Sequence, residues 1–369
     1  MTVYLDHAGL GRLRAPARAA MRAALDEVLP HGSVAIGRVF PARRQARALV
    51  AGLLECSPDE VAFTPNTSTG IHLVADGLAW RPGDEVVVFD RDFPANVHPW
   101  RALADRGVRL VWVPMRAGGY RLEDLEAAIG PATRLVAVSH VNFATGFRID
   151  LAAVCELAHR AGALVCVDAV QSLGVLPLSV RAAPVDFLAA GAHKWLNGPM
   201  GTGVFFCRAA RLAELRTPNG WFGFQGANDM LSKGAGHFSY DLAPVPTAAR
   251  VEGGMFDVLG MVGLAAALAE LETVGVAAVA DRVHRLTQWL RAGLVDIGCT
   301  ISVPAGVDNW SGIVSFVHPA VDSVHLVQEL AANGVQVSLP DGQVRVAPHY
   351  WTDDAEVAHF LEEVTSRVS

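Results

Sequence analysis

The sequence predicts an α/β protein whose largely parallel sheet is covered by helices on both faces. Two observations lead to this fold class. Short apolar runs recur along the first two thirds of the chain, and they are almost continuous in hydrophobic residues, as strands buried on both faces must be. Amphipathic stretches with helical spacing separate these runs, and such strand–helix–strand alternation is typical of a parallel sheet.

The elements of the larger part follow in chain order. The predicted strands are Glu85–Phe89, Val108–Val113, Arg134–Ser139, Ala163–Asp168, Asp186–Ala190 and Thr202–Cys207. The helices expected between them are Pro94–Arg106, Leu122–Ile129 and Asp150–Ala161.

The pattern changes after about residue 255. Four helices are expected there, at Met255–Thr273, Val276–Ile297, Ser323–Asn333 and Asp353–Val368. Short strands are expected around Thr300–Val303, Gly312–Val317, Val335–Leu339 and Gln343–Ala347. This pattern indicates a smaller α+β domain. We therefore expect a large domain at residues 15–255, and a small domain that combines residues 1–14 with 256–369.

The composition restricts the classes of function. The chain has 369 residues, of which 51% are hydrophobic, and a net charge of −7 without a basic block. We therefore expect no nucleic-acid partner and no anionic membrane partner. The longest apolar run, Val258–Ala269, is well short of the roughly 20 residues that span a bilayer. No basic region precedes an apolar stretch in Met1–Leu10, so we expect a cytoplasmic protein without a signal peptide.

The five cysteines are scattered and form no Cys-x-x-Cys pair. A disulfide framework and a structural zinc site are therefore not expected. Each cysteine is interpreted as a small core residue.

Asp168 is the first candidate functional residue. It ends the predicted strand Ala163–Asp168, and ligands of open α/β sheets bind just outside the carboxyl ends of the strands. A carboxylate at this place could keep a pyridine nitrogen protonated, which pyridoxal 5′-phosphate (PLP) needs in order to act as an electron sink. A helix cap or a structural ion pair would also explain an aspartate here, so Asp168 alone leaves both interpretations open.

Lys194 lies in a loop of small residues that begins where the predicted strand Asp186–Ala190 ends. Gly191 and Ala192 let the backbone approach a bound group closely. A lysine amine in such a pocket can form a Schiff base if its pKa is lowered, although a lone lysine in a loop is more often a surface residue. An acidic strand end followed 26 residues later by His-Lys is more specific than either feature alone.

A hydroxyl-rich turn, Thr-Pro-Asn-Thr-Ser-Thr-Gly, opens an amphipathic helix at residues 64–70. Its free N–H groups, the hydroxyls of Thr67 and Ser68 and the helix dipole together make a site suited to a phosphate. An ordinary helix cap is the alternative interpretation.

Together these motifs resemble the class V aminotransferase family of PLP fold type I, which includes cysteine desulfurases, kynureninases, isopenicillin N epimerase-like proteins and C–S lyases. The resemblance extends from Tyr4–Ala8 to Arg345–Tyr350, and Val167–Gln171 followed by His193-Lys194-Trp195 is its most specific part. It implies a mainly parallel, seven-stranded type of sheet between helices, PLP as cofactor, an amino acid or amino-acid conjugate as substrate, and a homodimer.

The resemblance also implies roles for individual residues. Lys194 would form the Schiff base, and Asp168 would pair with the pyridine nitrogen. Gln171 would contact the ring oxygen of the cofactor, and Phe93 would stack on the face of its ring. The phosphate would be surrounded by Thr67, Ser68 and His193. Arg345 falls where the family binds the substrate α-carboxylate, which suits a planar guanidinium.

Three further residues are candidates. Asn142 precedes the position, here Phe143, where the family has an asparagine near the ring oxygen. Trp221 lies in a segment that resembles one lining the family's active site. Tyr350 follows Arg345 closely enough to line a substrate pocket. A structural role is the alternative for each, and Asp6 and His7 are expected in an N-terminal segment packed across the mouth of the site.

Departures from the family pattern bear on the reaction. Desulfurases have a histidine where Phe93 stands, and they carry a nucleophilic cysteine in a loop that here, Gly334–Val344, has none. A persulfide-forming desulfurase is therefore disfavoured. Gly191 replaces a phosphate-binding serine, and Met255 falls near a threonine that the family lends to the partner's phosphate, so some phosphate contacts must come from elsewhere.

We narrowly favour a C–S or other β-lyase acting on an α-amino acid, because Lys194 alone would suffice as the base for the Cα proton. An aminotransferase would use the same lysine, and an epimerase would need a proton donor on the face where Phe93 is unsuited. A non-enzymatic PLP-fold module has no need of Lys194, Asp168 and Arg345 together. A Rossmann dehydrogenase is not expected, because no Gly-x-Gly-x-x-Gly turn follows the first strand.

Overall fold

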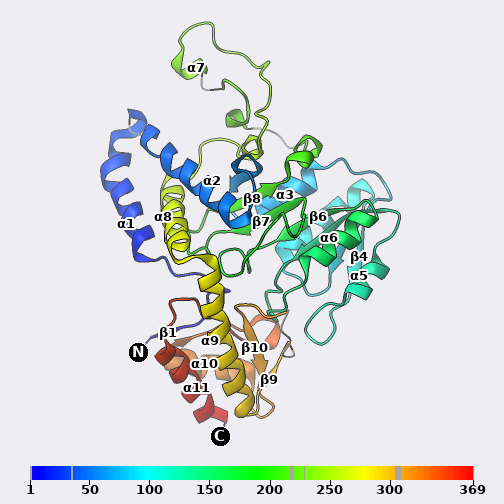
Figure 1. Cartoon of the computed structure of the whole chain (residues 1–369), viewed down its shortest axis with the longest axis vertical. Coiled ribbons are helices and arrows are strands. Elements are labelled where there is room, and N and C mark those ends of the chain that lie inside the picture. Colours follow the sequence, from blue (N-terminus) through cyan, green and yellow to red (C-terminus); the bar gives the residue numbers. More distant parts are fainter. Residues whose placement is uncertain (1, 35, 217–219, 228, 304–308, 369) are drawn as a thin grey trace.

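The computed structural model describes residues 2–34, 36–216, 220–227, 229–303 and 309–368 of the chain. Its largest sheet has seven strands in the order β2-β8-β7-β6-β5-β3-β4 (Figure 1). These strands are β2 (Val61–Thr64), β3 (Glu85–Phe89), β4 (Arg109–Val113), β5 (Thr133–Ser139), β6 (Leu164–Asp168), β7 (Phe187–Gly191) and β8 (Gly203–Cys207). Five of them, from β7 to β4, run parallel, whereas β8 is antiparallel to β7 and to β2. The predicted α/β class with a mainly parallel sheet is confirmed.

Apolar side chains cover both faces of this sheet. Along β3, Val87 faces one core and Val86 faces another, as the alternation of side chains along a strand requires. The first core includes α2 (Phe40–Leu54), α6 (Leu151–Arg160) and α8 (Val258–Val274). The second core includes α3 (Thr67–Gly77). Burial on both faces is why the strands are continuous in apolar residues.

The remaining helices of this part vary in length. α1 (Ala15–Ala23) and α2 both pack on α8, and none of the sequence patterns above predicts these first two helices. α5 (Leu122–Ala128) and α6 agree with the expected ranges. The other helical pieces are short: α4 (His98–Arg101), α7 (Asp229–Ser232), a π-helical turn at Ala24–Val28, and 3₁₀ turns at Leu29–Val34, Ile36–Arg38, Pro58–Glu60, Pro94–Asn96, Ala102–Arg106, Ala209–Glu214, Trp221–Gly223, Ala248–Val251 and Pro340–Gly342.

The expected helix Pro94–Arg106 is not continuous. A 3₁₀ turn ends at Asn96, α4 begins at His98, and a second 3₁₀ turn follows it. Val97, between them, has φ −123° and ψ −50°, outside the helical region. Pro99 has no backbone N–H with which to continue the hydrogen bonds of a preceding helix, and a proline is tolerated in the first turn of a helix, so a new helix starts here.

The C-terminal part has two small sheets. β1 (Val3–Tyr4) pairs in parallel with β11 (Val335–Gln336), and β10 (Val314–Val317) lies between β9 (Thr300–Ile301) and β12 (Val344–Val346) in antiparallel order. The helices α9 (Val276–Asp296), α10 (Ser323–Ala332) and α11 (Asp354–Val368) share a core with these strands. Both ends of the chain therefore lie in this part (Figure 1). The domain boundary at residue 255 stays a prediction, since α8 packs on α1 and α2.

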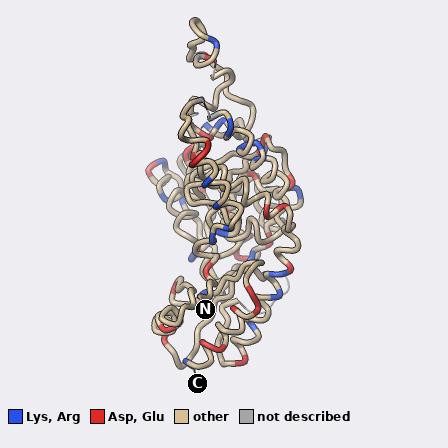
Figure 2. Tube along the Cα trace, turned by 90° about the vertical axis from the view of Figure 1, so that its left-hand side faces the viewer, with Lys and Arg blue, Asp and Glu red and all other residues tan. Residues whose placement is uncertain are grey.

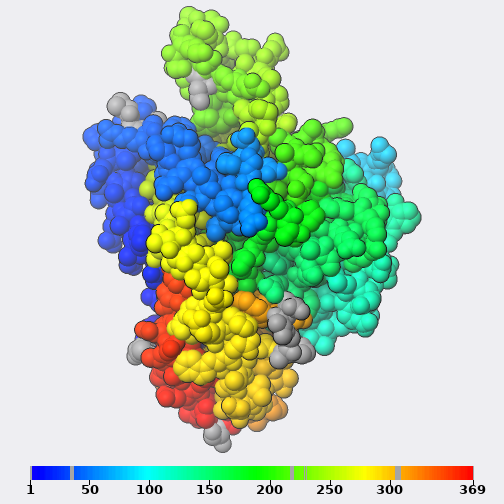
Figure 3. Space-filling view, viewed as in Figure 1, coloured from blue at the N-terminus to red at the C-terminus, as the bar shows by residue number. Residues whose placement is uncertain are grey.

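Lys and Arg residues are interspersed with Asp and Glu residues along the Cα trace (Figure 2). The segment that contains α7 projects from the body of the molecule (Figure 3). Across the described ranges, no single helix is long and apolar enough to cross a membrane. α8 and α9 meet the combined requirement of length and apolar composition only as a pair, and they are bent by 78° relative to each other.

Candidate active site

A cavity of about 510 Å³ lies at the carboxyl ends of the central strands, a size that suits a cofactor with its substrate. The loops that follow β3, β5, β6 and β7 reach it, as do the start of α3, the N-terminal segment and the loop before β12. Its lining includes seven of the residues singled out from the sequence, namely Thr67, Ser68, Phe93, Asp168, His193, Lys194 and Arg345. Ala8, Gly9, Asn66, Ala95, Phe143, Val170, Ser338, Leu339 and Pro340 complete the described lining.

Asp168 ends β6 with its side chain 2% exposed. One carboxylate oxygen accepts a hydrogen bond from the Val170 N–H at 2.9 Å, and Oδ2 has no partner among the described residues. Burial raises the pKa of this carboxyl; the charge of Asp92 adds to the effect, and the charge of Lys194 opposes it. Burial of a carboxylate oxygen without a hydrogen-bond partner costs free energy, so a cationic N–H donor at Oδ2 would be favourable. The protonated pyridine nitrogen of PLP is such a donor.

Lys194 lies three residues beyond the end of β7. Its Nζ is 5.7 Å from the centre of the Phe93 ring, so the amine and this ring face the same space. The loop is held by the Gly11 N–H, which donates to the His193 carbonyl at 2.7 Å. Burial lowers the pKa of Lys194, and the charge of Asp168 opposes this shift. A lowered pKa increases the fraction of neutral amine, the form that forms a Schiff base or accepts a proton.

The start of α3 borders the cavity through Asn66, Thr67 and Ser68. Asn66 caps the helix by accepting from the Thr69 N–H at 2.9 Å, and the N-terminal end of a helix is favourable for an anion. The Thr67 hydroxyl accepts from the Gly191 N–H at 2.8 Å and can still donate its own hydrogen. A side chain at Gly191 would come within 2.7 Å of the His193 ring. The His193 imidazole thus occupies the space that a serine at this position would need.

Arg345, in β12, is 5% exposed and has its guanidinium held from three directions. Nε donates to the Ser338 hydroxyl at 2.9 Å, Nη1 to the Phe143 carbonyl at 2.8 Å and Nη2 to the Asp6 carboxylate at 3.2 Å. The Ser338 hydroxyl in turn donates to Asp6 at 2.7 Å. These bonds use three of the five N–H donors and leave one on each terminal nitrogen, the arrangement that binds a carboxylate in a bidentate manner.

Asn142 does not line the cavity. Its amide nitrogen donates to the Arg91 carbonyl at 3.1 Å and to the Tyr120 hydroxyl at 3.0 Å, while its oxygen accepts from the N–H groups of the following turn. The whole amide is therefore occupied in holding this turn. The next residue, Phe143, lines the cavity instead, with its ring 5.1 Å from that of Phe93 in an edge-to-face arrangement.

Gln171 also lies outside the described lining. Its amide nitrogen donates to the Ala8 carbonyl at 2.9 Å, and its oxygen accepts from the Trp195 indole at 2.9 Å. The side chain thereby joins the N-terminal segment to the loop that carries Lys194. This bracing role is the one that the described contacts support.

Trp221 and Tyr350 lie away from the cavity within this chain. Trp221 stacks on Phe222 at 3.9 Å and lines a separate, apolar pocket of about 330 Å³ in the segment between β8 and α8. The Tyr350 ring lies 5.7 Å from the Arg14 guanidinium. Neither side chain belongs to the described lining of the cavity that contains Lys194.

His349 supports the Lys194 loop through contacts with Trp195, a role that no sequence pattern indicates. It is fully buried and stacks on Trp195 with ring centres 5.6 Å apart. Its Nδ1 accepts from the Tyr350 N–H at 2.9 Å, so Nε2 carries the hydrogen and donates to the Trp195 carbonyl at 3.1 Å.

No cysteine belongs to the described lining of the cavity. Four of the five thiols are buried and the fifth, Cys56, is partly buried, as expected of core residues. Burial raises the pKa of every thiol, for example that of Cys56 to about 12 and that of Cys299 to about 11. None of them is therefore both ionised and close to Lys194.

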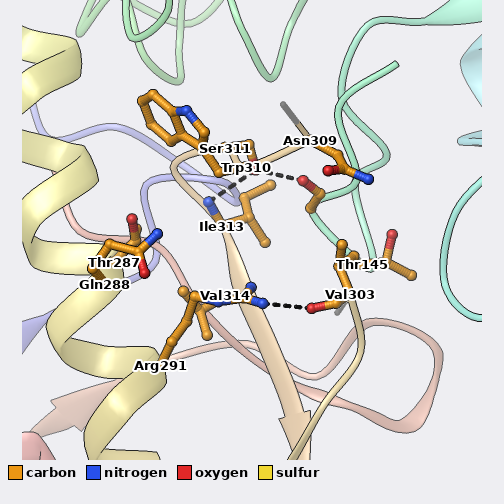
Figure 4. Close-up of a pocket in the computed structure, with 11 residues that line it drawn as sticks. Thr145, Thr287, Gln288, Arg291, Val303, Asn309, Trp310, Ser311, Ile313 and Val314 are labelled. Atoms are coloured by element: carbon orange, nitrogen blue, oxygen red, sulfur yellow. Dashed lines mark hydrogen bonds between the residues drawn. The ribbon is translucent and has the colours of Figure 1, made fainter. Parts of the chain in front are cut away.

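A second cavity lies between α9 and β10, but it holds only about 20 Å³, close to the volume of one water molecule. Figure 4 shows Arg291 crossing it to donate to the Val303 carbonyl at 2.6 Å, and Ser311 donating to a backbone carbonyl on the opposite wall. This space is too small for a cofactor or an amino acid. The cavity at Lys194 is thus the candidate active site.

Comparisons with known proteins agree with this geometry. The family model described as Aminotransferase class-V matches residues 28–357. A probable cysteine desulfurase of Methanothermobacter thermautotrophicus is 32% identical over 98% of this chain and 94% of its own. Two solved structures each have a TM-score of 0.88. One is a cysteine desulfurase of Thermococcus onnurineus NA1, 25% identical, over 100% of this chain and 94% of its own. The other is the cystine C–S lyase C-DES in complex with its reaction product cysteine persulfide, 27% identical, over 99% and 97%.

Proposed function

The chain belongs to the aminotransferase class-V family of PLP-dependent enzymes, and from this premise we propose that it cleaves the carbon–sulfur bond of cysteine or of a cysteine-derived amino acid. The observation that carries the proposal is the cavity in which the Lys194 amine, the unpartnered oxygen of Asp168 and the two remaining N–H donors of Arg345 face one space. The sulfur chemistry in the names of the relatives supports the choice of substrate.

The residues of the chain fit the cofactor in three places. Asp168 would hold the pyridine nitrogen through Oδ2, the start of α3 would hold the phosphate through Thr67 and Ser68, and Phe93 would cover the ring. When bound, PLP supplies an electron sink for the pair left at the substrate Cα after its proton is removed. Asp168 contributes by keeping a negative charge beside the ring nitrogen.

The substrate would be positioned by Arg345 and deprotonated by Lys194. The two free N–H donors of Arg345 would bind the α-carboxylate, and because Asp6, Ser338 and the Phe143 carbonyl fix the guanidinium, the Cα–H bond would have a fixed direction. Lys194 would accept the Cα proton, since burial favours its neutral form. The apolar rings of Phe93 and Phe143 would exclude water from this step.

We favour a C–S β-lyase, in which the sulfur-bearing group leaves directly. No cysteine belongs to the described lining of the cavity, and the loop at 334–344 contributes Ser338, Leu339 and Pro340 to it. A route that transfers sulfur to an enzyme thiol has no thiol to use there.

Persulfide-forming cysteine desulfurase action is the second candidate. Disfavoured from the sequence alone, it is supported by the names of the relatives, several of which are probable cysteine desulfurases. Transamination remains the third, because a lysine base and a carboxylate clamp serve it equally well. Epimerisation would need a second proton donor on the face occupied by Phe93, whose ring cannot supply one.

The products of cysteine and cystine distinguish these reactions. The purified, PLP-loaded enzyme is incubated with each amino acid, and pyruvate, ammonia, alanine and released sulfide or persulfide are measured, with Lys194→Ala as the control. A β-lyase gives pyruvate and ammonia in equal amounts, whereas a desulfurase gives alanine. Amine exchange that needs a 2-oxoacid and leaves sulfur on carbon would refute the proposal and favour an aminotransferase.

A further inference from the structure

The substrate end of the cavity is identified by contacts to Arg345. The Phe143 carbonyl accepts from its Nη1, and Ser338 is its backbone partner across an isolated antiparallel bridge. Leu339 and Pro340 follow Ser338 directly and also line the cavity. A group that extends from a substrate held by Arg345 therefore meets Phe143, Leu339 and Pro340. Together with Phe93, which contacts Phe143, these residues form the apolar wall of the cavity.

No uncommitted polar side chain lies at this end of the described lining. The titratable residues that line the cavity are Asp168, His193, Lys194 and Arg345, and the cofactor and the amino-acid part of the substrate account for them. Asn66, Thr67 and Ser68 belong to the start of α3, where the phosphate of the cofactor would bind. Ser338 already donates to Asp6 and accepts from Arg345. A charged substituent here would lose its water without gaining a partner.

The two members of an ion pair lie close to this wall along the chain. Arg91, two residues before Phe93, and Asp341, next to Pro340, form an ion pair at 2.9 Å. This pair joins the two loops that carry the apolar wall, so each charge is balanced by the other. A substituent that passes the wall would reach an ion pair that is already satisfied, and an exposed pair of this kind contributes little by itself.

Given C–S bond cleavage as proposed above, on which this step rests, we propose that the preferred substrates are cysteine thioethers with an uncharged, apolar substituent on sulfur, S-alkyl- or S-aryl-cysteines. The edge-to-face rings of Phe93 and Phe143 and the side chains of Leu339 and Pro340 form the surface that receives this substituent. Cystine and free cysteine, which leave this surface uncovered or place charges on it, are the poorer substrates.

The step balances without an oxidant or a reductant. The Cα proton passes to Lys194, the Cβ–S bond breaks, and its electron pair leaves on sulfur, which takes up a proton to become a thiol. The remaining three-carbon enamine adds water and releases ammonia, giving pyruvate. One thioether and one water thus yield one thiol, one pyruvate and one ammonia.

The test uses three thioethers of similar size and the PLP-loaded wild-type enzyme. S-propylcysteine is neutral in its substituent, S-carboxymethylcysteine carries a negative charge there and S-(2-aminoethyl)cysteine a positive one. We expect kcat/KM for S-propylcysteine to exceed that for both charged analogues and for cystine by about tenfold or more, because a charged substituent would be buried there without a partner. Affinity is measured in parallel from the change in visible absorbance on binding.

A change of the wall gives a second measurement. Leu339→Arg is expected to reverse the preference toward S-carboxymethylcysteine, and Val324→Arg, an exposed position on α10, is the matched control that should not. Equal or better use of the charged analogues by the wild type overturns the apolar-substituent proposal while C–S cleavage stands. The apolar-substituent proposal is also overturned, while C–S cleavage stands, if the enzyme releases sulfur from cysteine but neither cleaves nor tightly binds any of the thioethers. No C–S cleavage of any compound overturns both proposals.

Discussion

Replacement of His140 by phenylalanine is expected to make the protein more resistant to acid. His140 follows β5, is 7% exposed, and its Nδ1 has no hydrogen-bond partner among the described residues. Burial, reinforced by the charge of Arg148, lowers its pKa from 6.5 to about 3. The folded protein therefore keeps this ring neutral in mild acid, whereas the unfolded chain protonates it below pH ~6.5.

The magnitude follows from these two pKa values. Because the folded value is the lower one, the stability that comes from the neutral ring is complete above pH ~6.5 and is lost as the pH falls toward 3. At about pH 5, roughly 1.5 pH units below the unfolded pKa, the loss is about 2 kcal/mol, at ~1.4 kcal/mol per unit. The ring is still neutral in the folded protein at this pH, so the loss is set by the unfolded chain alone.

The assay is urea unfolding of the PLP-loaded enzyme at about pH 7.5 and about pH 5. The free energy of unfolding should fall between these pH values by about 2 kcal/mol less in His140→Phe than in the wild type. Because each protein is compared with itself at the two pH values, the effect of the substitution on packing cancels. His325→Phe, at an exposed position on α10, is the control and should retain the wild-type pH dependence. The same fall in His140→Phe and in the wild type would refute the reasoning.

Four more predictions concern the site. Lys194→Ala should lose the visible absorbance of the bound cofactor, and a band like that of the wild type would contradict the Schiff-base assignment. Asp6→Asn should raise KM about tenfold or more with little change in kcat or in the cofactor spectrum, because a charged hydrogen bond to Arg345 is worth ~1.5–3 kcal/mol; a loss confined to kcat would count against a positioning role. Burial raises the pKa of Asp168, so the cofactor-free enzyme should lose stability as the pH rises from the unfolded to the folded pKa of this carboxyl. Asp168→Asn should abolish this loss in urea unfolding, and the same pH dependence of the free energy of unfolding in both proteins would contradict the assignment to Asp168. Light scattering should give twice the 39.1 kDa of the chain if two copies assemble, and the chain mass alone would contradict a homodimer.

The large sheet could be predicted because burial leaves a local trace. Strands covered on both faces must be apolar at nearly every position, and β3, β5 and β6 lie within a residue of their predicted bounds. The break of the expected helix at Val97 was missed although Pro99 is visible in the sequence, since a proline near a helix start and one that breaks a helix give similar local patterns. α1 and α2 were missed because their helical character depends largely on packing against α8.

Side-chain partners within the site were less predictable than its residues. Seven candidates line one cavity, because they follow the carboxyl ends of neighbouring strands or begin the helix beside them. Asn142 and Gln171 carry the same amide group that the cofactor could use, but the backbone and Trp195 occupy it first. Which of several possible acceptors an amide binds depends on distances of a few ångströms that no sequence pattern records.

The sequence by itself determined the fold class, the cofactor and the placing of Asp168 and Lys194 in one site, because each depends on residues close together in the chain or on the ends of strands whose order is regular. Only the tertiary structure decided how the substrate end is built. It brings Asp6 against Arg345 across 339 residues, places the Phe143 carbonyl on the same guanidinium, and leaves all five thiols outside the cavity lining. Such contacts arise when separate segments pack together, and hydrophobic periodicity specifies only which face each segment buries.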